Sequence, residues 1–174
     1  MLANISNFSQ TADYLPIFTS VLITDLLVIL LLNTSIIKSR VLRDWYDKYN
    51  LSAIVCDVLI IFIGIIIARY LFSQFKQFFG AYSLYKFILL AVAVQIAHDL
   101  LFYKLFSGVA RGRNRMLDTF KDYGNEVSYK AILADSGMMI FASLLGAYLI
   151  GQSLNTNIIV LIVALYIMPY LLYN

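Results

Sequence analysis

The sequence predicts an all-α integral membrane protein: a five-span transmembrane helical bundle with a short interfacial amphipathic helix between spans three and four. Of its 174 residues, 61% are hydrophobic and 13% are charged, whereas soluble domains carry about 25% charged residues. The mean hydropathy is +0.82. The apolar residues form five runs, each near the length of about 20 residues that a helix needs to cross a bilayer. We therefore expect residues 1–174 to form a single transmembrane domain, with spans at about 16–37, 51–72, 84–106, 131–150 and 158–173.

The composition also excludes several classes of protein. Cys56 is the only cysteine, which excludes an internal disulfide and a cysteine-based zinc site. The net charge of +3 is small and scattered, so we expect no nucleic-acid partner. Residues 1–14 contain no lysine or arginine, and the first apolar run is too long for a signal peptide, so we expect no cleavable leader. Membrane lipid is the expected partner, and assembly with further copies of the chain stays open.

The first two spans each contain ionisable residues. Pro16 suits the first turn of a helix. Asp25 interrupts the first span near its middle, and Asn33 lies toward the end of that span. In the second span, Asp57 lies near the start and Arg69 near the end. Helix capping can also explain Asp57, because the helix dipole favours a carboxylate near the N-terminus of a helix.

The third span contains the only histidine, His98, directly followed by Asp99. An ionisable pair inside a membrane span is costly and indicates a functional site. Gln95 lies three residues before His98 and four before Asp99, so the three side chains share one helix face. The alternative is that the pair only forms an interhelical hydrogen bond that holds the bundle together.

The connection after the third span has the pattern of a helix that lies in the membrane surface. The two sides of this helix differ in character. The apolar side carries Met116, Leu117, Phe120 and Tyr123, and the opposite, charged side carries Arg113, Asp118, Lys121 and Asp122. We expect Gly124 and Asn125 to end this helix. The basic residues of the connection are candidate contacts for lipid headgroups, namely Arg111, Arg113, Arg115 and Lys121.

The last two spans complete the bundle and indicate its orientation. Asp135 and Ser136 lie near the start of the fourth span, and Ala142 and Gly146 form a packing notch in it. Tyr166 belongs to a row of tyrosines on the fifth span, where interfacial anchoring is the commoner role. The connections after spans one and three contain ten of the thirteen Lys and Arg residues. The positive-inside rule therefore predicts an outside N-terminus and a cytoplasmic C-terminus.

Polar residues of different spans converge at one depth in this orientation. Counting ~1.5 Å per residue from the cytoplasmic ends places most of them ~6–12 Å below the boundary, with Asp25 deeper. No lysine or arginine lies at their level. We predict an intramembrane polar site near the cytoplasmic leaflet, formed by Asp25, Asp57, Gln95, His98, Asp99, Asp135 and Ser136, with Asn33, Tyr103 and Tyr166 as secondary members.

Three functions fit such a site. Carboxylates without basic partners need a proton, a bound cation or access to water. The leading hypothesis is a transporter or channel for protons, cations or a small cationic solute, with Asp25 as the deepest relay. The second is an intramembrane metal-dependent enzyme acting on a lipid headgroup, with a divalent metal held by Asp57, His98, Asp99 and Asp135, although no HExxH spacing supports a metal. The third is a structural or host-interaction protein of a viral membrane.

Three segments in the second half of the chain carry a resemblance to a known group of proteins. They are residues 98–103 (HDLLFY), residues 112–126 (GRNRMLDTFKDYGNE) and residues 132–136 (ILADS). In this order they resemble small polytopic membrane proteins of unknown function that large DNA viruses of algae and protists encode. The resemblance covers about residues 84–150. It implies a viral or virus-derived source and a virion or host membrane, and it brings no known activity.

Overall fold

The computed structural model describes residues 2–127 and 129–174, and it confirms the all-α fold class. Five helices are long and apolar enough to cross a membrane: α1 (Tyr14–Asn33), α3 (Leu51–Gln74), α5 (Leu84–Gly108), α7 (Tyr129–Ile150) and α8 (Leu154–Leu172). Shorter helices are α2 (Arg40–Tyr49), α4 (Lys76–Phe79) and α6 (Arg115–Val127), and a 3-10 turn, Thr11–Asp13, precedes α1. The chain is thus a polytopic helical membrane protein.

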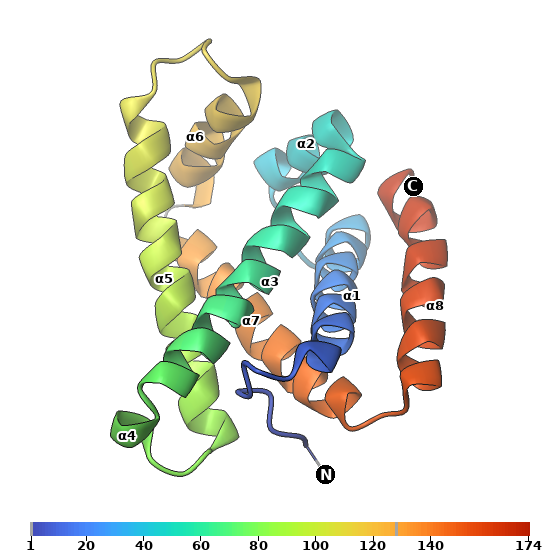
Figure 1. Cartoon of the computed structure of the whole chain (residues 1–174). Helices are drawn as coiled ribbons and strands as arrows, with labels where there is room; N and C mark the ends of the chain where they lie inside the picture. The colour runs from blue at the N-terminus through green and yellow to red at the C-terminus, as the bar shows by residue number, and fades with distance from the viewer. Residues whose placement is uncertain (1, 128) are drawn as a thin grey trace.

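The bundle has two ends, which we name by their content (Figure 1). The basic end carries α2, α6 and the C-terminus, and the N-terminal end carries the N-terminus, α4 and the turn between α7 and α8. The basic end includes the two connections that contain most of the Lys and Arg residues. The chain alternates between the two ends, so each span runs from one end of the bundle to the other.

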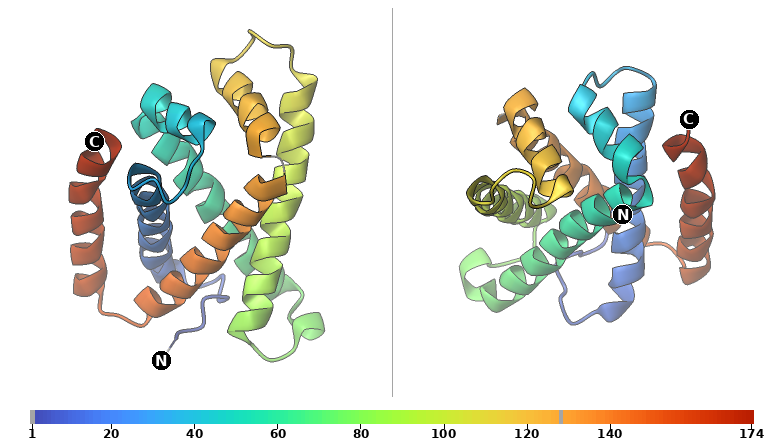
Figure 2. Two further views of the ribbon diagram at one scale, coloured as in Figure 1. Left: turned by 180° about the vertical axis from the view of Figure 1, so that it is seen from behind. Right: turned by 90° about the horizontal axis from the view of Figure 1, so that it is seen from above.

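Helix α1 forms the centre of the bundle and packs mainly against α7, α8 and α3. Helix α7 crosses the molecule diagonally, from α5 at the basic end to α8 at the N-terminal end (Figure 2). The predicted packing notch lies on the α7 face that meets α1: Ala142 is fully buried, and a Cβ on Gly146 would lie 3.1 Å from the Ser20 Oγ and 3.2 Å from the Ile5 Cδ1. Small residues therefore let α7 approach α1 closely.

The spans have boundaries that differ from the predicted ones by up to four residues. The first ends at Asn33 rather than at residue 37, because the chain turns at Ser35, which has a φ of +60°. The fifth begins at Leu154 rather than at residue 158, because the Ser153 Oγ caps it by accepting a hydrogen bond from the Thr156 N–H at 3.1 Å. The fourth begins at Tyr129, two residues before the prediction.

Residues 38–50, predicted only as a basic loop, contain helix α2. The Ser39 Oγ caps it by accepting from the Leu42 N–H at 3.1 Å. Its apolar face packs inward, with Trp45 and Tyr46 buried. The predicted helix after the third span is present as α6, but it continues through Gly124 and Asn125 to Val127. Whether α6 lies in a membrane surface stays a prediction.

The N-terminal segment folds onto the N-terminal end of the bundle. The Ala3 N–H donates to the Ala147 carbonyl at 2.9 Å. Arg69 of α3 is fully buried, donates to the carbonyl oxygens of Asn7 and Gln10, and pairs with the Asp13 carboxylate at 2.8 Å. These contacts cover the N-terminal end of the bundle.

Candidate functional site

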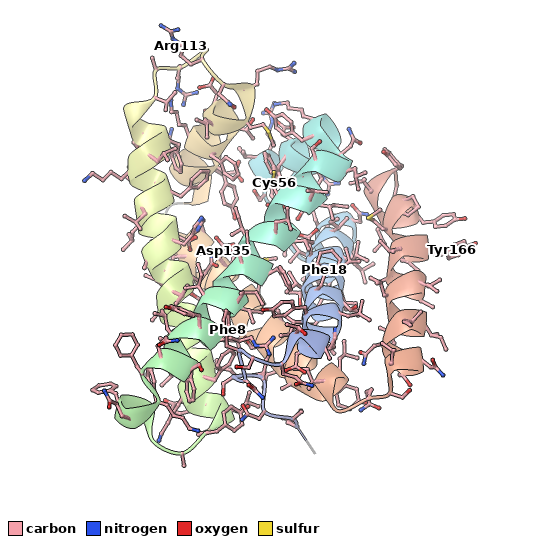
Figure 3. All side chains as sticks on the ribbon, viewed as in Figure 1. Phe8, Phe18, Cys56, Arg113, Asp135 and Tyr166 are labelled. Carbon is pink, nitrogen blue, oxygen red and sulfur yellow. The ribbon has the colours of Figure 1, made fainter. Side chains whose placement is uncertain are left out.

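A cavity of about 860 Å³ occupies the basic end of the bundle, with walls from α1, α3, α5 and α7 and a roof from α2 and α6. Most of the side chains that line it are apolar, and carboxylates interrupt the apolar walls. Figure 3 shows one of them, Asp135, in the gap that α3 and α5 frame. The exposed Lys38 and Lys130 also line the cavity, so its mouth reaches the surface at this end.

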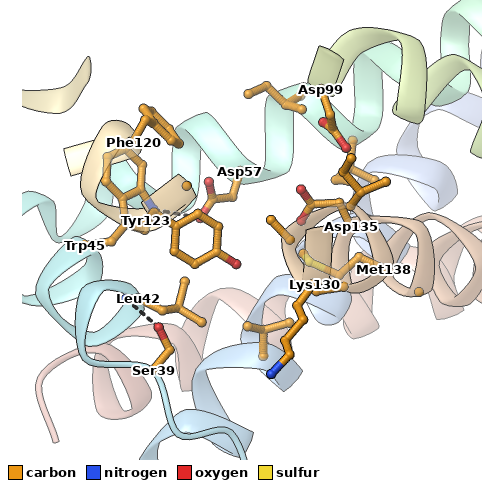
Figure 4. Close-up of a pocket in the computed structure, with 18 of the residues that line it drawn as sticks. Ser39, Leu42, Trp45, Asp57, Asp99, Phe120, Tyr123, Lys130, Asp135 and Met138 are labelled. Carbon is orange, nitrogen blue, oxygen red and sulfur yellow. Dashed lines mark hydrogen bonds between the residues drawn. The ribbon is translucent and has the colours of Figure 1, made fainter. Parts of the chain in front are cut away.

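Three carboxylates from three helices face this cavity (Figure 4): Asp57 from α3, Asp99 from α5 and Asp135 from α7. The Trp45 Nε1 donates to the Asp57 Oδ2 at 2.9 Å. The Gln95 Nε2 donates to the Asp99 Oδ1 at 2.7 Å, and the His98 Nδ1 lies 3.2 Å from the same oxygen. The site therefore positions its carboxylates with neutral donors and one histidine.

A fourth carboxylate, Asp25 of α1, lies behind the cavity wall. It is fully buried, and the Tyr46 hydroxyl donates to its Oδ1 at 2.9 Å. The same Tyr46 side chain also lines the cavity. Burial, and then the charges of Asp25 and Asp57, raise the pKa of the Tyr46 phenol well above its ordinary value, so Tyr46 stays protonated and remains a donor. Tyr46 thus connects the cavity to the deeper Asp25.

The roof is held together by hydrogen bonds and ring contacts between α2 and α6. The Ser39 Oγ donates to the Glu126 Oε1 at 2.6 Å, and the Val41 N–H donates to its Oε2 at 3.1 Å. The Trp45 and Phe120 rings lie 4.8 Å apart between centroids. Tyr123 extends from α6 toward Asp57 and Asp135 (Figure 4). Burial, followed by the charges of the surrounding carboxylates, raises the pKa of its phenol, so Tyr123 is a neutral hydroxyl inside the site.

Two exposed lysines, Lys38 and Lys130, line the mouth of the cavity. They do not neutralise the carboxylates. Within residues 2–127 and 129–174, the five ion pairs of the protein include neither Asp57 nor Asp135. Figure 4 shows the Lys130 side chain extending away from Asp135. The carboxylates therefore lie in a largely apolar cavity, and among the described residues none of them pairs with a lysine or arginine.

The structure brings together most of the predicted site. Six of the predicted residues line the cavity: Asp57, Gln95, His98, Asp99, Tyr103 and Asp135. Ser136 does not line it. Neither does Asn33, whose Nδ2 donates to the Leu171 carbonyl at 2.7 Å and so ties α1 to α8. Tyr166 is exposed on α8, away from the site. Its hydroxyl accepts from the Tyr170 hydroxyl at 3.3 Å.

The structure places the candidate metal ligands in the cavity and the candidate headgroup contacts at the basic end. Among the residues that the structure describes, no group of three or more His, Cys, Asp or Glu could hold a metal ion, so Asp57, His98, Asp99 and Asp135 share a cavity without forming a ligand cluster. Arg111 pairs with Asp122 at 2.8 Å, and Lys121 donates to the Val109 carbonyl. Arg113 and Arg115 are exposed, and Figure 3 shows Arg113 at the basic end.

Sequence reasoning missed the roof residues Trp45, Tyr46, Tyr123 and Glu126. The signal for two of them was present, because Leu42, Trp45, Tyr46 and Tyr49 follow the i, i+3, i+4, i+7 spacing of an amphipathic helix directly after a capping serine. Comparison of the chain with family models, with curated proteins and with solved structures finds no match. The interpretation of the site therefore rests on its geometry.

Proposed function

We propose that this membrane protein binds cations, protons included, in the carboxylate cavity and moves them through the bundle as a transporter or channel. The observation that carries the proposal is the convergence of Asp57, Asp99 and Asp135, from three helices, on one largely apolar cavity without a lysine or arginine partner. A carboxylate removed from water needs a proton or a cation to compensate its charge, and such residues in membrane spans commonly mark ion pathways.

The arrangement of the two ends supports movement rather than binding alone. The cavity reaches the surface at the basic end, while the N-terminal segment and Arg69 cover the other end. Between them, Tyr46 connects the cavity to Asp25. In this proposal the molecule is open toward the cytoplasm, since the positive-inside rule places the basic end there. The resemblance to viral membrane proteins supports a viral or host membrane as its location.

The two other hypotheses have less support. A metal-dependent enzyme needs a group of metal ligands, and the described residues contain none. A purely structural role leaves a cavity of about 860 Å³ and its unpaired carboxylates without an explanation. It makes one distinct prediction: neutral replacements of the carboxylates fold normally, and the wild-type protein moves nothing.

The experiment is a paired measurement of stability and flux. We expect Asp99→Asn and Asp25→Asn to fold and to lose most of the proton or monovalent-cation flux that the wild-type protein shows in liposomes. Asp122→Asn is the matched control, because Asp122 is exposed and, among the described residues, pairs with Arg111 alone. Wild-type flux in both folded variants, or absence of wild-type flux between about pH 5 and 8, where histidines change charge, would overturn the proposal.

A further inference from the structure

We infer that the cavity takes a bulky organic amine: a ligand with an apolar, aromatic body and one protonated amino group. This inference rests on the proposed function and names the class of cation that the site fits. It depends on three features of the described residues: the size of the cavity, its aromatic lining, and buried hydrogen-bond acceptors that have no donor.

The size of the cavity fits an organic molecule better than a bare ion. Ligand pockets for small molecules commonly measure about 300–1,000 Å³ and have apolar walls with a few polar groups. This cavity, at about 860 Å³, lies in that range. An inorganic cation that leaves water needs several oxygen ligands at short distance, and the described residues contain no cluster of carboxylates and histidine that would supply them.

The aromatic lining offers a surface for the ring system of such a ligand, with a carboxylate directly beside it. Trp45 and Phe120 meet in the roof, and the Phe102 and Phe120 rings lie 5.0 Å apart between centroids. All three line the cavity, as does Tyr123. Since the Trp45 Nε1 donates to Asp57, the indole lies directly beside a carboxylate. A cation held there gains from the negative charge of Asp57, and the neighbouring rings offer apolar contact area to the body of the ligand.

The unpaired acceptors indicate an amine that carries N–H groups. Gln95 lines the cavity and is only 2% exposed, yet its Oε1 has no hydrogen-bond partner among the described residues. The same holds for the buried Asp99 Oδ2. A buried acceptor without a donor is costly. A protonated amino group that reached both oxygens would satisfy them, whereas a quaternary ammonium has no hydrogen to donate.

The charges around the cavity favour a single positive charge over several. Asp57, Asp99 and Asp135 attract a cation, and the exposed Lys38 and Lys130 at the mouth oppose it. Because Coulomb repulsion grows with the charge of the ligand, the lysines disfavour a multiply charged cation more than a monocation. The apolar walls then hold the body of the ligand.

Trp45 provides the assay, since it is the only tryptophan of the chain and lies in the cavity. The probe is 1-pyrenemethylammonium, which accepts energy from tryptophan. Its comparison ligands are the neutral 1-pyrenemethanol, the anionic 1-pyrenecarboxylate, the N-trimethylated amine and methylammonium. We expect saturable quenching of Trp45 by the amine, and binding at least about tenfold weaker for each comparison ligand.

Variants test whether the carboxylates and Gln95 hold the amine. Asp135→Asn and Asp99→Asn should each weaken amine binding at least about tenfold, a change of about 1.4 kcal/mol, and leave pyrenemethanol unaffected. Gln95→Leu should reduce the preference for the primary amine over its trimethylated form. Asp122→Asn should bind like the wild type. Two different Asp variants are used so that misfolding of one does not end the test.

The outcomes separate this inference from the proposed function. Equal binding of pyrenemethanol and the amine would mean partition into apolar space and would overturn the inference. Proton or rubidium flux without amine binding would overturn the inference and leave the proposed function standing. Absence of both would overturn the two together. Saturable, carboxylate-dependent binding of the amine in a well-folded protein would support both.

Discussion

Replacement of Asp13 by asparagine should destabilise the fold through its buried partner, Arg69. The two side chains are 9% and 0% exposed, and the Arg69 Nη2 lies 2.8 Å from the Asp13 Oδ2. Two further nitrogens of Arg69, Nε and Nη1, have no partner among the described residues. Asp13→Asn therefore leaves a buried guanidinium without a counter-charge.

The size of the effect follows from what remains around Arg69. Removing one partner of a buried ion pair costs ~3–5 kcal/mol. The carbonyl oxygens of Asn7 and Gln10 still accept from Arg69, and its guanidinium lies 5.3 Å from the centre of the Tyr14 ring. These contacts place the expected loss at the lower end, about 3 kcal/mol. Arg69→Met combined with Asp13→Asn should cost less than Asp13→Asn alone, because the buried charge is gone.

The assay is unfolding of the purified protein in mixed micelles of increasing SDS content, followed by Trp45 fluorescence. The exposed pair of Arg111 and Asp122 supplies the control: its side chains are 56% and 52% exposed, so Asp122→Asn should change stability by no more than ~1 kcal/mol. The reasoning is refuted if Asp13→Asn costs no more than Asp122→Asn, or if adding Arg69→Met lowers stability further.

Three further predictions concern the relay, the helix packing and the topology. Tyr46→Phe removes the donor to the buried Asp25, so we expect the free energy of unfolding to fall by ~1–3 kcal/mol. Proton flux should be lost while amine binding is retained. Proton flux equal to that of the wild type in liposomes would contradict the relay. Gly146→Ala should destabilise by ~1–3 kcal/mol because its Cβ meets Ser20 and Ile5, while Gly137→Ala, with no atom within 4 Å, should be neutral or stabilising in the same unfolding assay. Cysteines at Ser39 and Ser107 should resist membrane-impermeant reagents applied to the outside of intact cells, and efficient labelling there would invert the topology.

The sequence predicts the spans and most of the cavity because both depend on regular helix geometry. Five long apolar runs require five helices, since backbone groups in lipid must bond within the segment. The constant rise per residue converts sequence position into depth, which is why Asp57, Asp99 and Asp135 could be expected at one level before any packing was known. Which helices are neighbours does not follow from depth, and the packing decided which of the predicted residues share the cavity.

The residues that the sequence misplaced have local physical reasons. Asp135 and Ser136 are adjacent, so they point about 100° apart on the helix and only Asp135 faces the cavity. Tyr166 has a suitable depth, but α8 packs mainly on α1, on the side of α1 away from the cavity. The Asp13–Arg69 pair joins residues 56 positions apart, and hydropathy alone does not show that the N-terminal segment folds back onto the bundle.

The central claim is that the carboxylate cavity holds a cation, and anomalous diffraction tests it most directly. Crystals of the protein would be soaked separately with thallium(I) and with 4-iodobenzylammonium. Thallium and iodine are both identified by their anomalous scattering. The account predicts an anomalous peak from at least one of them inside the cavity, beside Asp57, Asp99 or Asp135, and its loss in Asp99→Asn or Asp135→Asn. Full occupancy elsewhere on the protein with an empty cavity, from both soaks, would contradict the account.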